Sequence, residues 1–422
     1  MAALSDVVRI VVPGDKSVSH RALIFAALAT GASRIAGILD SADVRSTASV
    51  LRALGVPVPP LGPTMVVTGV GLGGLRPSPE SLDCGNSGTT TRLMAGVLAA
   101  HRFASDVVGD ASLSRRPMRR VAAPLEAMGA RVILTTGGTL PMHIDGAPLQ
   151  GIRWQSETSS AQVKSAILLA GLVAGVEVTV AEPTPSRDHT ERFLQALGAD
   201  VRVNGGITLV PPDALRPFAL AVPGDPSSAA FFAALASVGD GRVVELPNVL
   251  ASPTRDGLFR ALARMGADVE RDAPVVTDAG EFVTTYRIRA GQLNGITVGP
   301  ADVPAMVDEI PLLACVAACA SGETRITGAS ELRVKESDRI ATTVANLRAI
   351  GADAEELFDG LVVRGTAGQS LWGRVVTDGD HRIAMAFAIL GARRGNAIEI
   401  DDPDCVAVSY PGFWADLEAA TR

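Results

Sequence analysis

Five segments with glycine between two apolar residues recur along the 422-residue chain, at intervals of 68 to 85 residues. They are Leu54-Gly55-Val56, Met128-Gly129-Ala130, Leu197-Gly198-Ala199, Met265-Gly266-Ala267 and Ile350-Gly351-Ala352. Each is typical of a helix that ends just before glycine and continues into a strand. The interval is that of one supersecondary block, so the chain is predicted to consist of repeated α/β units.

Six polar segments, each preceding an apolar helical pattern, predict where helices begin. They are Gly14-Asp15-Lys16-Ser17, Gly85-Asn86-Ser87-Gly88-Thr89, Glu157-Thr158-Ser159-Ser160-Ala161-Gln162, Gly224-Asp225-Pro226-Ser227, Asp308-Glu309-Ile310-Pro311 and Gly379-Asp380-His381-Arg382. Together the two kinds of signal predict six units, each with the order helix, strand, helix, strand, strand. The last unit lacks a segment with glycine between two apolar residues.

The first unit shows the predicted order of helices and strands in detail. Helices are predicted over Lys16–Ala29 and Ala42–Leu54, with a strand over Ser33–Ile38 between them. Two extended runs follow, at 56–58 and at Met65–Val70, where apolar residues alternate. Because a chain of this length is long for one core, two domains are expected, with the boundary before Pro223, which gives three units on each side.

Composition excludes several classes of function. A net charge of −7 argues against nucleic acid or an acidic membrane as a main partner. The four cysteines show no zinc-type spacing, the five histidines are scattered, and no P-loop, Rossmann glycine fingerprint or GxSxG motif is present, so neither a metal nor a nucleotide cofactor is expected. The N-terminal residues lack a signal-peptide pattern, and a cytoplasmic protein is expected.

The remaining chemistry lies at the predicted helix starts. A helix N-terminus with free N–H groups beside Lys16, Ser17 and Arg21 is an anion site, most simply for phosphate, although a capped helix with solvated cations would look the same. The most charged stretch, Glu331–Arg339, has the alternative of a solvated helix face, and acids such as Asp308 also stabilise a helix N-terminus. Several anion sites with a few carboxylates suit transfer between two phosphorylated small molecules.

Six motifs in order make the chain similar to the 5-enolpyruvylshikimate-3-phosphate (EPSP) synthase family. They are Gly14–Arg21, Gly85–Thr89, Arg115-Arg116-Pro117-Met118, Ser160–Ser165, Arg333–Arg339 and Asp380-His381-Arg382. The resemblance implies two similar α/β domains, each of three βαβαββ units (an inverse α/β barrel), with the active site in the cleft between them. The first domain would comprise 14–222, and the second 1–13 and 223–422, which includes an N-terminal strand.

The resemblance also implies the substrates and the residues that bind them. Shikimate 3-phosphate would be bound by Lys16, Ser17, Arg21, Ser159, Ser160, Gln162, Ser186, Arg187, Asp308 and Lys335. Phosphoenolpyruvate would be bound by Lys16, Asn86, Gly88, Thr89, Arg116, Gln162, Arg339 and Arg382. Family members act without cofactor, and glyphosate occupies their phosphoenolpyruvate site; a monomer without nucleic-acid or membrane partners is expected.

Three residues would carry the chemistry by the same resemblance. Asp308 would take the proton from the 5-hydroxyl of shikimate 3-phosphate. Glu336 would protonate the methylene carbon of phosphoenolpyruvate and later remove a proton, with Lys16 assisting. A tetrahedral adduct would then lose phosphate.

The chain departs from the pattern of some members at three positions. Val408 and Ser409, rather than a lysine, precede Tyr410-Pro411; Leu93 stands where some members have proline, and Ala161 where some have a second serine. One contact to an anion is therefore absent or made by another group. These features resemble a more divergent branch, whose response to glyphosate is less uniform.

Two alternatives remain. The UDP-N-acetylglucosamine enolpyruvyl transferases share the fold, but they have Asn after the first lysine and a loop cysteine, where this chain has Ser17 and no cysteine near Arg115. A non-catalytic homologue that keeps the anion sites should have lost Lys16, Asp308 or Glu336, and all three are present.

Overall fold

The computed structural model describes residues 7–239 and 241–422. The chain divides into two compact units, one of 14–222 with 276–281, the other of 1–13, 223–275 and 282–422. The sequence-based division assigned 276–281 to the second domain, whereas these residues group with the first. The physical reason is a buried ion pair: Glu281 lies 2.7 Å from Nδ1 of His189, and both side chains are almost fully buried.

The unit built on 14–222, the N-terminal unit, has six helices and eleven strands among its described residues. The helices are α1 (Lys16–Leu28), α2 (Ala42–Ala53), α3 (Gly88–Ala99), α4 (Arg119–Met128), α5 (Ala161–Ala174) and α6 (His189–Ala196). The strands are β2 (Thr30–Ala36), β3 (Thr64–Val70), β4 (Leu82–Asp83), β5 (Ala104–Val108), β6 (Arg131–Ile133), β7 (Met142–Asp145), β8 (Ile152–Gln155), β9 (Val178–Ala181), β10 (Asp200–Val203), β11 (Ile207–Val210) and β12 (Ala219–Ala221).

The C-terminal unit is built in the same way. Its helices are α7 (Pro226–Val238), α8 (Gly257–Met265), α9 (Ile310–Cys319), α10 (Arg339–Ala349), α11 (His381–Ala392) and α12 (Phe413–Thr421). Its strands are β1 (Val7–Arg9), β13 (Val243–Leu250), β14 (Asp268–Arg271), β16 (Phe282–Arg289), β17 (Thr297–Val298), β18 (Glu323–Ile326), β19 (Asp353–Leu357), β20 (Gly360–Arg364), β21 (Trp372–Val375) and β22 (Ala397–Ile400), while β15 (Val275–Val276) lies at the junction of the two units.

The sheets show the predicted repeat. In the sheets β4-β5-β7-β6, β10-β11-β9-β8 and β17-β18-β20-β19, the strands before and after the first helix pair in parallel, and a hairpin completes the sheet. The sheet β1-β13-β16-β14 follows the same scheme, with β15 added beside β16. The repeated α/β architecture predicted from the glycine and helix-start signals is therefore confirmed.

The first and last repeats are shorter. The sheet β12-β2-β3 has three strands, and residues 56–58, predicted to be extended, lie outside any strand. Pro57, Pro59 and Pro60 cannot donate to a strand ladder, which accounts for this difference. The last repeat has only the parallel pair β21-β22 and ends in the helix α12 instead of a hairpin.

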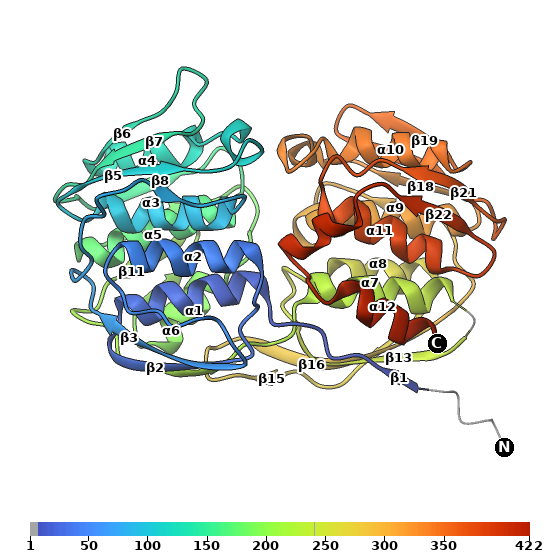
Figure 1. Ribbon diagram of the computed structural model, residues 1–422, viewed down its shortest axis with the longest axis horizontal. Helices are drawn as coiled ribbons and strands as arrows, with labels where there is room; N and C mark the ends of the chain where they lie inside the picture. Colours follow the sequence, from blue (N-terminus) through green and yellow to red (C-terminus); the bar gives the residue numbers. More distant parts are fainter. Residues whose placement is uncertain (1–6, 240) are drawn as a thin grey trace. The chain divides into compact units, whose positions relative to one another are not determined.

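Two strands that are remote in sequence complete the first sheet of each unit. β1 pairs in parallel with β13, so that Val7 lies opposite Val243 (Figure 1). β12, at the end of the N-terminal unit, pairs in parallel with β2, so that Leu220 lies opposite Ile35. Each unit therefore closes with a strand that the chain supplies far from the rest of that sheet.

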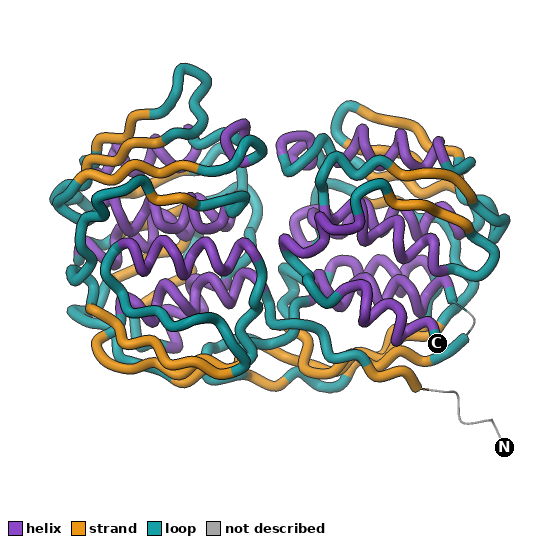
Figure 2. Tube along the Cα trace, viewed as in Figure 1, coloured by secondary structure: helices purple, strands orange, loops and turns teal. Residues whose placement is uncertain are grey.

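The helices fall into two kinds. The first helix of each repeat, such as α5 or α9, is buried on nearly all sides, and these helices pack against one another within each unit. The second helices, such as α8, are amphipathic and bury one face. Sheets lie around the helices of each unit (Figure 2). None of the described helices combines the length and apolarity needed to cross a bilayer.

The local signals for helix ends are confirmed. Asp15 caps α1 by accepting a hydrogen bond from the Val18 N–H at 2.7 Å, and Asp225 and Asp380 cap α7 and α11 in the same manner. The glycines of the five repeated segments all have φ between 88° and 116°, in the region that favours glycine. Each first helix thus presents its N-terminus, and the polar residues around it, at the same place in its repeat.

Candidate active site

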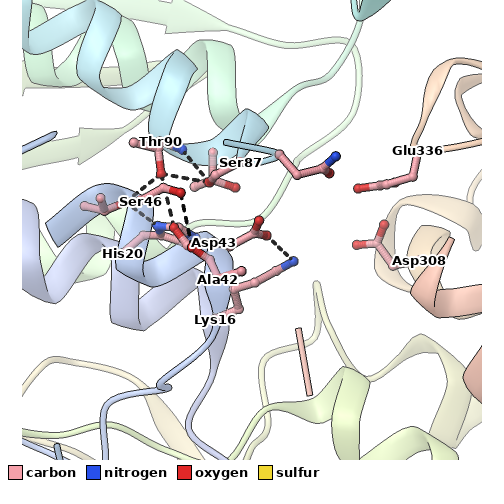
Figure 3. Close-up of polar contacts among 12 residues, drawn as sticks. Lys16, His20, Ala42, Asp43, Ser46, Ser87, Thr90, Asp308 and Glu336 are labelled. Atoms are coloured by element: carbon pink, nitrogen blue, oxygen red, sulfur yellow. Dashed lines mark hydrogen bonds and ion pairs between the residues drawn. The ribbon is translucent and has the colours of Figure 1, made fainter. Parts of the chain in front are cut away.

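The start of α1 carries the first predicted group. The ammonium of Lys16 lies 2.8 Å from Oδ2 of Asp43, in the first turn of α2 (Figure 3). Behind it, Nδ1 of His20 lies 2.7 Å from the Thr47 hydroxyl, which is 2.7 Å from the hydroxyl of Thr90. Burial lowers the pKa of His20 well below its ordinary value, and Lys16 adds to this effect. His20 is therefore neutral and links α1 with α2 and α3.

Arg21 is a buried cation held by neutral groups. Its guanidinium donates to the hydroxyls of Thr190 and Ser165, at 2.7 and 2.8 Å, and to the carbonyl of Ser17. Carboxylates such as that of Glu191 raise its pKa through their charge, but none is among its hydrogen-bond partners in the described part of the chain. Burial lowers the pKa of Arg21 to about 10. A desolvated cation with neutral hydrogen-bond partners is well suited to bind an anion such as phosphate.

Three predicted serines lie on the loops that precede α5 and α6, the helices that carry Ser165 and Thr190. Ser160 caps α5, and Ser159 is bonded to Thr184 through its hydroxyl. Ser186 donates its hydroxyl to the carboxylate of Glu182, which also accepts the N–H of Ser160 at 2.8 Å. The charge of Arg187 adds to the lowering of the pKa of Arg21, so two cations act on the same region.

Four of the residues predicted to bind phosphoenolpyruvate in this unit form two hydrogen-bonded groups near the start of α3. Arg116 donates to Oδ1 of Asn86 at 2.7 Å, and Asn86 in turn donates to Asp110. Gln162 donates to the Thr89 hydroxyl at 3.0 Å and accepts a hydrogen bond from Arg92 at 2.6 Å.

Gly88 opens α3 within this group. A Cβ there would come within 2.8 Å of the Arg92 guanidinium and 3.4 Å of that of Arg116. The absence of a side chain at position 88 thus leaves room for two cations.

In the C-terminal unit, Arg339 gathers three carboxylates. It donates to Asp380 at 2.8 Å, to Glu336 at 2.7 Å and to Asp308 at 3.3 Å. Burial lowers the pKa of Arg339, but the three carboxylates more than reverse this effect and raise it above the ordinary value. Figure 3 shows the neighbouring carboxylates of Asp308 and Glu336. Two acids on one permanent cation are arranged for proton transfer.

The other predicted residues of this unit lie around the same cluster. The ammonium of Lys335 is 3.6 Å from Asp308, and Arg382 is 3.7 Å from Glu309. The N–H of Arg382 donates to Asp380, the cap of α11. Burial has the largest single effect on the pKa of Asp380 and would raise it, but the charge and hydrogen bonds of Arg339, together with the charge of His381, bring the pKa below its ordinary value, so Asp380 is ionised.

Several of the predicted residues thus lie in hydrogen-bonded groups within their own unit, and the structure adds residues that the sequence did not reveal. Asp43, Glu182 and Glu191 were not predicted. Glu182 and Glu191 both pair with Lys164, and the signal for them was available, since a lysine within the apolar helix α5 requires a buried counter-charge. Among the described residues, no group of three or more metal-ligating side chains is arranged to hold an ion.

Comparison with known proteins identifies the family. The family model for EPSP synthase (3-phosphoshikimate 1-carboxyvinyltransferase) matches residues 3–417. The chain is 49% identical to a 3-phosphoshikimate 1-carboxyvinyltransferase from Sulfurihydrogenibium sp. (strain YO3AOP1), over 97% of this chain and 96% of that one. It is 50% identical to the protein of the same name from Xanthomonas campestris pv. campestris (strain 8004), over 95% and 92%.

A solved EPSP synthase from Acinetobacter baumannii has the same fold. Its TM-score to this chain is 0.87 at 41% sequence identity, and the match covers 99% of this chain and 96% of that one. Both the sequence and the structure thus match over nearly the full length. This chain belongs to the EPSP synthase family, the 3-phosphoshikimate 1-carboxyvinyltransferases.

Proposed function

We propose that this protein transfers the enolpyruvyl group of phosphoenolpyruvate to the 5-hydroxyl of shikimate 3-phosphate and releases phosphate, a step of the shikimate pathway to aromatic amino acids. Family membership over nearly the whole chain supports the reaction. The observation that carries it within the structure is Arg21, a buried cation whose hydrogen-bond partners among the described residues are hydroxyls and a carbonyl. Such a group fits a phosphate ester better than a neutral substrate.

In this proposal the N-terminal unit binds shikimate 3-phosphate through the region of Arg21. Its residues are Lys16, Ser17, Arg21, Ser159, Ser160, Gln162, Ser186 and Arg187, with Asp308 and Lys335 added from the C-terminal unit. The hydroxyls and guanidinium groups donate hydrogen bonds to the phosphate, and the burial of Arg21 strengthens its attraction to the anion.

Phosphoenolpyruvate is bound by a second set of residues, four of which are cations. The set comprises Lys16, Asn86, Gly88, Thr89, Arg116, Gln162, Arg339 and Arg382. The bond from Arg116 to Asn86 supports this assignment, because it fixes the guanidinium beside the N-terminus of α3, where free N–H groups favour an anion.

The chemistry is assigned to Asp308, Glu336 and Lys16. Asp308 takes the proton of the 5-hydroxyl as its oxygen bonds to C2 of phosphoenolpyruvate, and Glu336 gives a proton to C3. The tetrahedral adduct then loses phosphate, which leaves with the proton that Asp308 had taken, while Glu336 takes a proton back from C3 and the double bond re-forms. The hydrogen bonds from Arg339 to both acids support these roles, because they hold the two carboxyl groups in fixed positions next to each other.

The test is phosphate release by the purified protein. Release should require both shikimate 3-phosphate and phosphoenolpyruvate, and should proceed in the presence of a chelator and without nucleotide. UDP-N-acetylglucosamine in place of shikimate 3-phosphate tests the related transferase activity. Activity with that substrate alone, or no release with the proposed pair, would contradict the proposal.

We also propose that the enzyme acts as a cytoplasmic monomer without nucleic-acid or membrane partners. The net charge of −7 supports the lack of nucleic-acid binding. All proposed site residues come from one chain, which supports a monomer. Size-exclusion chromatography coupled to light scattering should give the mass of a single 43.4 kDa chain.

A further inference from the structure

A buried ion triad lies beneath the loops that carry Ser160 and Ser186. The ammonium of Lys164, on α5, lies 3.1 Å from Glu182 and 2.7 Å from Glu191. All three side chains are at most 6% exposed. Glu182 follows β9, and Glu191 lies in the first turn of α6. The triad therefore links α5, the end of β9 and α6 through ion pairs that are shielded from water.

The two carboxylates of the triad have different further partners. Glu182 accepts the N–H of Ser160 at 2.8 Å, the N–H of Ser186 at 3.3 Å and the hydroxyl of Ser186 at 2.7 Å. Glu191, by contrast, contacts neither serine, and its Oε2 has no hydrogen-bond partner among the described residues. One carboxylate thus holds both loops, whereas the other pairs with Lys164 and also acts through its charge on Arg21.

Lys164 keeps Glu182 in place. Burial lowers the pKa of Lys164, but Glu191 and Glu182 together raise it above its ordinary value, so the ammonium stays charged. A buried carboxylate with a fixed ammonium on one side has few alternative positions. Its remaining lone pairs are directed to the two loops, and the serines are ordered before any substrate binds.

We propose that Glu182, anchored by Lys164, is a positioning residue for shikimate 3-phosphate, because it fixes Ser160 and Ser186 in the arrangement that receives the phosphate. The inference rests on the proposed function. The single hydroxyl proton of Ser186 is donated to Glu182 in this structure. When a phosphate binds, that hydroxyl turns to the anion, while the two N–H groups stay on Glu182 and hold the loops.

The experiment compares Glu182→Gln with the matched control Glu191→Gln. Both substitutions remove one buried carboxylate from Lys164, but only the first alters the contacts of the serines. Glu182→Gln should raise the KM and the Kd for shikimate 3-phosphate by about 10-fold or more, because misplaced binding groups lose much of their effect. The KM for phosphoenolpyruvate and kcat should change by less than about 3-fold. Glu191→Gln should lower Tm without this change.

A second variant serves if Glu182→Gln does not fold. Glu182→Asp keeps the charge beside Lys164 and shortens the reach to the serines by one methylene, so it should also weaken shikimate 3-phosphate selectively. An unchanged KM for this substrate, or an equal increase in the Glu191 variant, would overturn the inference. If the wild type neither binds shikimate 3-phosphate by calorimetry nor releases phosphate, the proposed function itself fails.

Discussion

The ammonium nitrogen of Lys16 lies 2.8 Å from Oδ2 of Asp43, although 27 positions separate the two residues in the chain. The Asp43 side chain is 10% exposed and that of Lys16 is 20% exposed, so the pair is well shielded from water. Asp43 thereby fixes the end of a long, flexible side chain at the N-terminus of α1. The lysine that we propose to act on two anionic substrates is thus held by the carboxylate of Asp43 in the structure without substrates.

Replacing Asp43 tests this relationship. Asp43→Asn should lower kcat/KM by at least about 10-fold, because a shielded ammonium without its carboxylate no longer has a fixed position. The matched control is Asp40→Asn, which breaks an exposed pair with Arg45 next to the same helix and should change kcat/KM by less than about 2-fold. Steady-state kinetics with both substrates varied give the values. Equal kcat/KM in the two variants would show that Lys16 needs no anchor.

Glu336→Gln should separate binding from chemistry. The amide keeps the size of the side chain and an oxygen that can accept from Arg339, but it cannot move a proton. We expect kcat to fall by about 10²-fold or more with the Kd for shikimate 3-phosphate nearly unchanged. Glu356→Gln, which removes an exposed partner of Arg333 in the same unit, is the control and should keep wild-type kcat. Turnover near the wild-type rate in Glu336→Gln would assign the proton to another group.

The buried charge of Arg21 predicts that anions stabilise the protein. Shikimate 3-phosphate at about 100 times its Kd should add about 2.7 kcal/mol to the free energy of unfolding. Arg21→Gln should lose most of this increase, which differential scanning fluorimetry measures as a shift in Tm. Arg192→Gln removes a half-buried arginine already paired with Asp188 at 2.8 Å, and should keep the shift. A full shift in Arg21→Gln would place the phosphate elsewhere.

Two histidines of the N-terminal unit should affect stability in opposite directions with pH. Burial lowers the pKa of His20 in the folded state, so the unfolded chain binds more protons and His20 destabilises the fold as pH falls below about 6.5. Hydrogen bonds to Asp106 and Asp145 raise the pKa of His143, so its stabilisation is present at low pH and is lost as pH rises through that pKa.

Urea unfolding between pH 5 and 8, compared for His20→Gln and His143→Gln, measures these slopes. Below pH 6.5, the His20→Gln variant should show a smaller slope of the free energy of unfolding against pH than the wild type, by at most about 1.4 kcal/mol per pH unit. The His143→Gln variant should lack the stabilisation that His143 gives at low pH, so its free energy of unfolding should fall more steeply than that of the wild type as pH decreases. Identical slopes in both variants and the wild type would contradict both assignments.

Gly88→Ala should change the response to glyphosate. The added methyl would press on the guanidinium of Arg92 and approach that of Arg116, which narrows the space beside the N-terminus of α3. Wild-type inhibition should be competitive with phosphoenolpyruvate, and the variant should raise the inhibition constant by a larger factor than the KM, because glyphosate is the longer molecule. Equal factors, or a non-competitive pattern in the wild type, would show that position 88 does not shape this pocket.

The amino-acid sequence by itself determined the repeats and the residues at their helix starts. Caps such as Asp15 and the glycines after the second helices act within a few residues, so their effect can be read from local patterns. The motifs that resemble the family are of the same kind: Lys16 and Arg21 lie within five positions of each other, and Glu336 and Arg339 within three. Where local signals compete, as around Pro57, the prediction of a strand was wrong.

Only the tertiary structure decided which distant groups these residues meet. Arg21 binds Ser165 and Thr190, which are 144 and 169 positions away, and residues 276–281 join the other unit through Glu281. Asp43 and Glu182 look like ordinary acids in the sequence. Their roles depend on packing, which places each carboxylate beside the ammonium of a different lysine and shields each pair from water. Periodicity specifies which face of a helix is buried, but the partner across the interface is set by how whole elements pack.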